Sequence, residues 1–233
     1  MILYKEPEDF KGGALILVDK PLQWTSFDVV NKLRWCLKGR CGKLKVGHAG
    51  TLDPLATGLV IICTGEWTKG IAQYEGQSKE YLAEIRFGVT TPSFDLETEV
   101  DSEYPYLHID KVSLEEVLKQ FIGELEQVPP IFSAVHIDGV RAYKKARQGD
   151  IPTMQARTVT IHEIELLQFA LPIVTLRIVC GKGTYIRSLA RDIGLACGSG
   201  ATLSGLRRTH IGDFSVDDAE NLDDLVAQLQ KKC

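Results

Sequence analysis

The segment from Lys45 to Gly65, KVGHAGTLDPLATGLVIICTG, constrains the fold of this chain more than any other stretch. Its first part is rich in glycine, and its end, Leu59 to Cys63, is an unbroken apolar run of strand length. Glycine permits positive φ values and lets a ligand approach the main chain closely. The segment therefore predicts an accessible loop that leads directly into a buried strand.

Asp53 is the candidate reactive group of this loop, because no other carboxylate occurs between Asp28 and Glu66. A lone acid held by a glycine-rich loop is a candidate nucleophile. Asp53 also precedes Pro54, and an Asp-Pro pair commonly initiates a turn without any chemical role. The loop by itself leaves both interpretations open.

The length and composition are those of an ordinary soluble protein. A chain of 233 residues with 44 % hydrophobic and 25 % charged residues can bury a substantial core. No apolar run approaches the roughly 18 residues of a membrane span, and the N-terminus lacks the pattern of a secretion signal. We therefore expect a cytoplasmic protein. The six cysteines form no CxxC pair, so we expect reduced thiols and no metal site.

Basic residues are concentrated in three clusters, although the net charge is −4. Any one cluster could be a solvated helix face, and the second could also be a flexible arm at 142–149. Together they bracket glycine-rich loops, which favours binding of a polyanion. The clusters are Lys32, Arg34, Lys38, Arg40, Lys43 and Lys45; Arg141, Lys144, Lys145 and Arg147; and Arg207 and Arg208.

Hydrophobic periodicity predicts a mixture of helices and strands. A helix that begins at Thr25 or Ser26 is expected to bury a face made of Phe27, Val30, Leu33 and Leu37. A second helix is expected to begin with a capping box of Ser113 and Glu116, and a last one covers 221–232. Strands are predicted at 14–18, 59–63, 81–87, 131–137, 158–169 and 173–180, whereas 90–106 is predicted to be a loop with little chemical signal.

Two positions at the start of the helix predicted after 181–184 are chemically suggestive. Tyr185 and Arg187 follow the sequence GKGT, at a helix start where the dipole favours anions. A surface ion pair is an equally good interpretation of Arg187. Because the pattern GxxxxGK[ST] is absent, we reject a P-loop nucleotide site. Tyr81 begins an alternating strand and is typical of core packing.

Several motifs taken together resemble the TruB family of bacterial tRNA pseudouridine synthases, which convert a uridine in the T loop of tRNA to pseudouridine. They are DKP at 19–21, GHAGTLDPLATG at 47–58, KEY at 79–81, PPIFSAV at 129–135, GKGTYIRSLARDIG at 181–194 and LRR at 206–208. The resemblance implies an α+β fold with a mixed, mostly antiparallel central sheet flanked by helices and loops. It also implies a single catalytic domain over 1–233, with a family core at 14–209, a helical tail at 210–233, and no PUA domain of the kind many members carry.

The resemblance also implies roles for individual residues. Asp53 would be the catalytic aspartate and would pair with Arg187. Tyr81 and Tyr185 would contact the target base, and Tyr81 is the residue we favour for relaying a proton. The remaining implied site residues are His48, which would help to hold the everted nucleotide, and Lys20 and Leu206, which would shape the wall of the site.

The implied partner is the T arm of tRNA, bound by a monomer without a cofactor or an obligate protein partner. The residues expected along the RNA backbone are Arg34, Lys38, Arg40, Lys43, Lys45, Arg141, Lys144, Lys145 and Arg147. The uridine must be detached at its N-glycosidic bond, rotated and rejoined through C5, which requires a nucleophile but no redox group. Attack by the aspartate on C1′ and loss of the C2′ proton to form a glycal both fit the residues.

Two other classes of function remain as alternatives. The chain could bind and refold tRNA, with isomerisation secondary. It could also be an aspartate-nucleophile hydrolase, although no acidic partner that would bind a metal accompanies Asp53 in the sequence.

Overall fold

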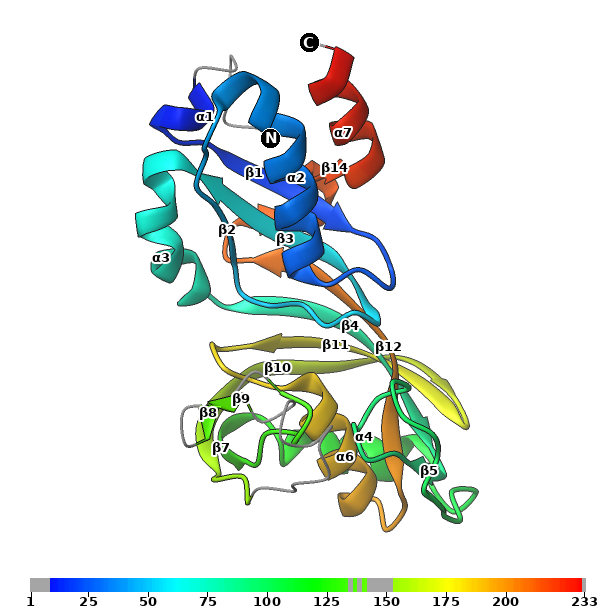
Figure 1. Cartoon of the computed structure of the whole chain (residues 1–233). Coiled ribbons are helices and arrows are strands. Elements are labelled where there is room, and N and C mark those ends of the chain that lie inside the picture. The colour runs from blue at the N-terminus through cyan, green and yellow to red at the C-terminus, as the bar shows by residue number, and fades with distance from the viewer. Residues whose placement is uncertain (1–8, 134–135, 138–139, 142–152, 232–233) are drawn as a thin grey trace. The chain divides into compact units, whose positions relative to one another are not determined.

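The computed structural model describes residues 9–133, 136–137, 140–141 and 153–231, which belong to two compact units (Figure 1). Unit 1 comprises the chain up to Tyr81 together with the residues from Leu206 onward, and unit 2 comprises Leu82–Gly205. Strands β4 (Lys79–Phe87) and β12 (Ala201–Ile211) each begin in one unit and end in the other. Unit 1 therefore joins two segments that are far apart in the sequence.

The sheet of unit 1 is built on β1 (Leu15–Lys20) and β3 (Ala56–Thr64), which pair antiparallel. Strand β2 (Val46–Ala49) also pairs antiparallel with β3, whereas the second half of β12 pairs parallel with it. Two short strands complete this part, β13 (Phe214–Ser215) beside β12 and β14 (Glu220–Asn221) beside β1. The loop that carries Asp53 lies between β2 and β3.

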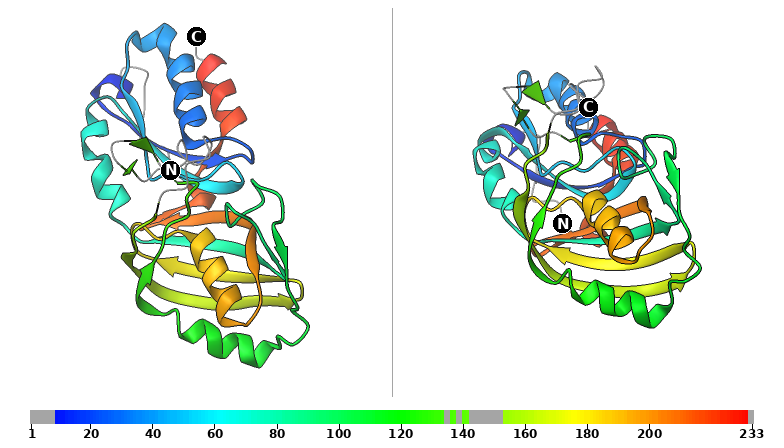
Figure 2. Two further views of the ribbon diagram at one scale, coloured as in Figure 1. Left: turned by 60° about the horizontal axis from the view of Figure 1, so that its bottom comes forward. Right: turned by 90° about the horizontal axis from the view of Figure 1, so that it is seen from below.

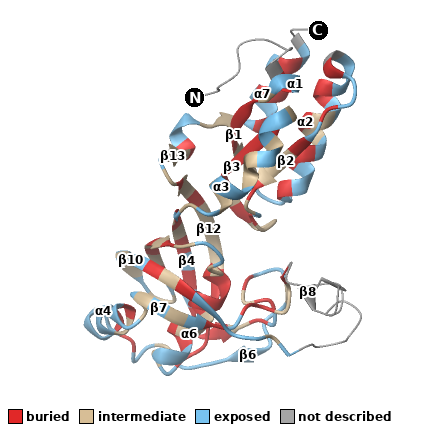
Figure 3. Ribbon diagram, turned by 90° about the vertical axis from the view of Figure 1, so that its left-hand side faces the viewer, coloured by how far each residue is buried: buried red, intermediate tan, exposed pale blue. Residues whose placement is uncertain are grey.

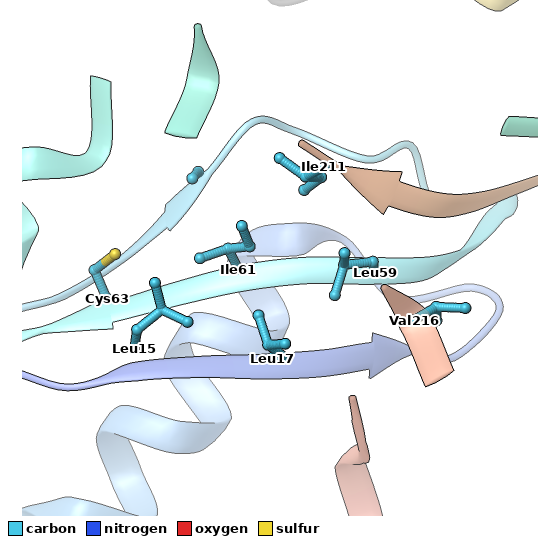
Figure 4. Close-up of a cluster of buried hydrophobic side chains, with 8 residues drawn as sticks. Leu15, Leu17, Leu59, Ile61, Cys63, Ile211 and Val216 are labelled. Atoms are coloured by element: carbon cyan, nitrogen blue, oxygen red, sulfur yellow. The ribbon is translucent and has the colours of Figure 1, made fainter. Parts of the chain in front are cut away.

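Alternate residues of β1 and β3 form a buried apolar cluster on one face of this sheet (Figure 4). The residues between them, such as Ile16 and Ile62, are also fully buried, so both faces of these strands are covered (Figure 3). This explains why the sequence at 59–63 is continuously apolar rather than alternating. The cluster consists of Leu15, Leu17, Ala49, Leu59, Ile61, Cys63, Ile211 and Val216.

Helix α2 (Ser26–Cys41) begins after Thr25, whose hydroxyl accepts a hydrogen bond from the Asp28 backbone N at 3.0 Å, as predicted. It packs beside α7 (Leu222–Lys231), which confirms the predicted C-terminal helix (Figures 1 and 2). The prediction that Phe27 is buried was wrong, because its side chain is 57 % exposed and lies near the Arg34 guanidinium. The remaining helical segments of unit 1 are α1 (Asp9–Gly12), α3 (Ile71–Glu75) and the 3₁₀ turns Gly65–Gly70 and Val216–Asp218.

In unit 2, β10 (Arg157–Ala170) pairs antiparallel with β7 (Gly123–Gln127) and β11 (Ile173–Cys180), and β4 and β12 follow β11 in the strand order. Helix α6 (Ile186–Ala196) lies along this sheet (Figure 2). Its residues Ile186, Leu189, Ala190 and Ile193 are buried. Helix α4 (Lys111–Lys119) contacts α6 and β10. Two separate short pairs are β5 (Val89–Thr90) with β6 (Ser102–Glu103), and β8 (His136–Ile137) with β9 (Val140–Arg141).

The predicted mixed, mostly antiparallel sheet with flanking helices is confirmed, with corrections to single elements. The capping box of α4 consists of Asp110 and Ser113, not Ser113 and Glu116, because the carboxylate one turn earlier accepts from the Ser113 backbone N at 2.8 Å. In the stretch predicted as a strand at 131–137, residues 131–133 bend instead, and residues 136–137 form β8. The predicted arm at 142–149 lies outside the described residues. Among the described helices, none has the length and apolar composition needed to cross a membrane.

Gly58→Ala is expected to destabilise the protein by at least about 3 kcal/mol, because two unfavourable effects add at this position. Gly58 has a φ of +105°, and a Cβ atom placed there would lie 2.3 Å from the backbone O of Arg208. The expected fall in Tm is roughly 6–12 °C for a chain of this size, measured by thermal unfolding. Gly39→Ala is the matched control, because Gly39 lies in α2 with open space around its Cα, so alanine there should raise Tm slightly. Equal Tm values for the two variants would contradict the close approach of β3 and β12.

Candidate active site around Asp53

The loop from Gly50 to Leu55 is fixed at several points of its main chain, and Asp53 lies in its middle with a half-buried side chain. The Ser26 hydroxyl accepts from the Leu52 backbone N at 2.8 Å and lies 3.1 Å from its O, so the first turn of α2 holds the residue before Asp53. The Pro54 O accepts from the Gln23 backbone N at 2.8 Å, and the Asp53 O accepts from the Ala56 backbone N at 3.1 Å. The carboxylate is therefore presented from a loop held on both sides.

Arg208 is buried against this loop. The residue is 1 % exposed, and its guanidinium donates to backbone carbonyl oxygens of Leu59, Gly50 and Thr51 at 2.8, 3.2 and 3.4 Å. The prediction that Arg208 belongs to an anion-binding surface cluster was wrong, because its donors face the protein interior. Its neighbour Arg207 is partly exposed and pairs with Asp19, with 2.7 Å between Nη2 and Oδ2.

Lys20 is a second buried cation in the same region. It is 0 % exposed, and Nζ donates to the carbonyl oxygens of Trp24 at 2.7 Å and Pro21 at 3.0 Å. Burial lowers the pKa of Lys20 from 10.5 to about 8, the Asp53 carboxylate opposes this shift, and the charge of Arg208 adds to it. Weaker contributions from Asp28 and Asp19 raise the pKa. Lys20 thus interacts electrostatically with both Asp53 and Arg208.

Because the pKa of Lys20 is lowered in the folded protein, the folding stability depends on pH in the alkaline range. Because the unfolded chain holds this proton up to about pH 10.5 and the folded chain only up to about pH 8, the stability cost of burying the charge is present below pH 8. The free energy of unfolding should therefore rise between about pH 8 and 10.5, by roughly 3 kcal/mol for this group. Urea unfolding of Lys20→Met across this range should lack that rise, whereas Lys43→Met, at an exposed lysine, should retain it. If the free energy of unfolding changed with pH in the same way in the wild type, Lys20→Met and Lys43→Met, a buried, charged Lys20 would be contradicted.

His48 lies on β2, and the pKa of its imidazole is lowered by burial and by the charge of Arg208. Its Nδ1 atom is buried and has no hydrogen-bond partner within the described residues. A neutral ring with an unused polar atom is suited to contact a ligand. Leu206, in β12, is half-buried and pairs in register with Ala56, just after the Asp53 loop. Tyr81 is buried on β4, with the alternation predicted for that strand.

Arg187 and Tyr185 belong to unit 2, at the start of α6. Arg187 is 3 % exposed, and its Nε lies 3.6 Å from Oδ2 of Asp95, which is buried as well. Its Nη1 donates to the carbonyl oxygens of Phe132 at 3.0 Å and Ser93 at 3.2 Å. The interpretation of Arg187 as part of a surface ion pair is therefore wrong, because its pair with Asp95 is buried. The Tyr185 backbone N donates to Oε1 of Gln127 at 2.8 Å.

Asp95 is the residue that sequence reasoning missed, in a segment predicted to carry little chemical signal. Its Oδ1 accepts from the Glu97 backbone N at 3.0 Å, and its backbone carbonyl oxygen accepts from the hydroxyls of Thr91 and Ser93. The segment is thus a compact hydrogen-bonded turn that presents a carboxylate to Arg187. An Asp two residues before an amide it can accept from is a turn signal, but its ionic partner is distant in the sequence.

The structure assigns Lys20, His48, Asp53, Tyr81 and Leu206 to unit 1, and Tyr185 and Arg187 to unit 2. Pairing of Arg187 with Asp53 and the base contacts of the two tyrosines stay predictions. Among the predicted RNA-backbone residues, Arg34 donates to Asn31 Oδ1 and to the Val46 O, while Lys38, Lys43 and Lys45 are exposed. The side chains of Arg40, Arg141, Lys144, Lys145 and Arg147 lie outside the described part.

Two family models match consecutive parts of this chain. The N-terminal domain of TruB family pseudouridylate synthases matches residues 38–186, and the C-terminal domain of tRNA pseudouridylate synthase B matches residues 187–232. The chain belongs to the TruB family. A TruB family relative from Flavobacterium johnsoniae, called tRNA pseudouridine synthase B, is 54 % identical over 91 % of this chain and 94 % of its own length. One of the same name from Parabacteroides distasonis is 53 % identical over 94 % of this chain and 96 % of its own length.

Solved structures support the pseudouridine synthase fold of this TruB family member. A Cbf5-Nop10-Gar1 complex contains a chain that is 31 % identical, with a TM-score of 0.72 over 96 % of this chain and 56 % of that one. An H/ACA RNP bound to a substrate RNA containing 2′-deoxyuridine contains a chain that is 28 % identical, with a TM-score of 0.70 over 96 % of this chain and 55 % of that one. This chain therefore spans little more than half of those proteins.

Proposed function

We propose that this chain isomerises a uridine in the T loop of tRNA to pseudouridine, with Asp53 as the nucleophile. The observation that carries the proposal is the presentation of Asp53 from a loop whose main chain is fixed by Ser26, Gln23 and Arg208. Family membership and relatives above 50 % identity named tRNA pseudouridine synthase B support it.

The reaction conserves every atom of the nucleoside. The bond between N1 of uracil and C1′ breaks, the base turns, and a bond forms between C5 and C1′ while the proton on C5 leaves and N1 gains one. A carboxylate can attack C1′ directly or remove the C2′ proton to give a glycal, and both routes begin from ionised Asp53.

The target uridine must leave the T loop before it can reach Asp53. Eversion costs a few kcal/mol and is offset by stacking and backbone contacts. His48 is suited to accompany the everted nucleotide, because it is neutral and has a buried nitrogen without a partner in the described chain. We assign base contact to Tyr81 and Tyr185, and backbone contact to the exposed lysines 38, 43 and 45. The expected setting is the cytoplasm, and the expected acting form is a monomer.

The test is incubation of the protein with an unmodified T-arm transcript, followed by mapping of pseudouridine by mass spectrometry. We expect one pseudouridine, at the T-loop uridine, and none in a transcript that carries cytidine there. A chelator should leave the rate unchanged, which separates the synthase from a metal-dependent hydrolase. Pseudouridine at another position would overturn the substrate assignment, and no pseudouridine would overturn the activity.

A further inference from the structure

Arg208 is a deeply buried charged side chain that contacts the Asp53 loop, and its backbone is fixed to the strand that follows the loop. Arg208 pairs with Gly58 in the parallel register of β12 and β3. The two backbones approach so closely that a Cβ on Gly58 would lie 2.3 Å from the Arg208 O and 2.7 Å from its N. The base of the Arg208 side chain is therefore held relative to β3.

The guanidinium reaches from this position to both ends of the loop region. Nε donates to the Leu59 O within β3, while Nη2 and Nη1 donate to the carbonyl oxygens of Gly50 and Thr51, which precede Asp53. Gly50 has a φ of +80°, a backbone conformation that favours glycine. One planar group thus links the residues before the catalytic aspartate to the strand after it.

No ion pair in the described part of the chain involves Arg208, whereas the adjacent Arg207 has one with Asp19. A buried guanidinium that meets only carbonyl dipoles is costly for the fold, and an apolar side chain would avoid that cost. The charge does act on the site, since it lowers the pKa of both Lys20 and His48. Packing alone therefore does not explain an arginine at this position.

We propose that Arg208 is a positioning residue for the isomerisation: it holds the Gly50 and Thr51 carbonyls and thereby fixes the main chain that presents Asp53. The inference rests on the proposed function for its kinetic consequence, but not for its structural one. A displacement of about 1 Å in a reacting group can reduce a rate about 100-fold, so a loosened loop should reduce turnover without weakening RNA binding.

Two substitutions separate the charge of Arg208 from its geometry. Arg208→Lys keeps the charge but offers one ammonium instead of a planar group with five N–H donors, so it cannot reproduce all three contacts. Arg208→Met keeps an unbranched stem and removes every donor. Arg177→Met is the control, because Arg177 forms ion pairs with Glu163 and Glu165 at the surface of unit 2.

Single-turnover rates and RNA dissociation constants should be measured with the T-arm transcript. We expect the rate to fall about 100-fold in Arg208→Met and about 10-fold in Arg208→Lys, while the Kd for RNA stays within about threefold in both. The control variant should match the wild type in both measurements. Hydrogen exchange followed by mass spectrometry should show faster exchange in peptides covering 50–58 of Arg208→Lys, with other peptides unchanged.

A folded Arg208→Lys with wild-type turnover and wild-type exchange in 50–58 would overturn the proposal. So would an equal loss of turnover and RNA affinity, which would identify a contact with RNA. If Arg208→Met does not fold, the lysine variant decides. If the wild type makes no pseudouridine, the proposed function has failed, and exchange in 50–58 still confirms or refutes the positioning role.

Discussion

Asp53→Asn is expected to abolish pseudouridine formation, with a loss of at least about 10⁴-fold in the single-turnover rate. The amide has nearly the same shape as the carboxylate, so the loop and its contacts with Ser26, Gln23 and Arg208 should persist. It has no negative charge with which to attack C1′ or to accept the C2′ proton, so both routes fail. The rate should be measured with excess enzyme on the T-arm transcript, by mass spectrometry of the product.

The Kd for RNA of Asp53→Asn should stay within about threefold of the wild-type value, because the substitution removes no hydrogen-bond donor or positive charge that could contact phosphate. Asp213→Asn, at an exposed aspartate of unit 1, is the matched control and should be fully active. Full activity of Asp53→Asn would exclude Asp53 as the nucleophile. Loss of RNA binding together with activity would instead indicate a structural role, the turn interpretation that the Asp-Pro sequence leaves open. A variant that speeds tRNA refolding without isomerising it would show that the two activities are separable.

Local periodicity predicted three of the elements around the candidate site, but not β2, which carries His48, or β12, which carries Leu206 and Arg208. The apolar run 59–63 lies within β3, the alternation from Tyr81 matches β4, and the apolar spacing after Tyr185 matches α6. These patterns work because each element buries a face whose spacing is fixed by its own geometry. The position of Asp53 in a loop before β3 follows from the same local pattern, whereas the contacts that fix this loop come from residues distant in the sequence.

Periodicity could not show what the buried charged residues contact. Arg207 and Arg208 are adjacent and identical in type, yet one pairs with Asp19 at the surface and the other is buried among carbonyl groups of the Asp53 loop. Only the pairing of β12 with β3, segments distant in the sequence, decides which arginine faces the loop. Phe27 was assigned to the buried face for a related reason, since its spacing fits the apolar stripe although its side chain is exposed.

Asp95→Asn is expected to reduce the rate of isomerisation about 100-fold, because it removes the charge that faces Arg187. Arg187 and Asp95 are both nearly inaccessible to solvent, so their charges are weakly screened. The ion pair acts on the Nε side of the guanidinium, beside the Nη1 hydrogen bonds to Phe132 and Ser93, and contributes to the orientation of the arginine side chain. Family resemblance implies that Arg187 pairs with the catalytic aspartate. If Asp95 orients Arg187, the loss should appear in the single-turnover rate and not in the Kd for RNA.

Asparagine is the suitable replacement, because its amide oxygen can still accept a hydrogen bond from the Glu97 backbone N, as Oδ1 of Asp95 does in the native protein. Asp95→Ala would also lose that bond and remove the whole carboxylate from the buried ion pair with Arg187, at a cost of about 3–5 kcal/mol in stability. Asp101→Asn is the matched control, because Asp101 is exposed in the same segment and accepts from the Thr90 hydroxyl.

A double-mutant cycle with Arg187→Lys tests whether Asp95 acts through Arg187. If the two residues work as one unit, the double variant should be no slower than the slower single variant. If the rate losses of the two single variants multiply in the double variant, Asp95 acts through a different contact, such as the turn that it forms with Thr91 and Ser93. A folded Asp95→Asn with the wild-type rate would show that the buried pair serves the fold of unit 2 and not the reaction.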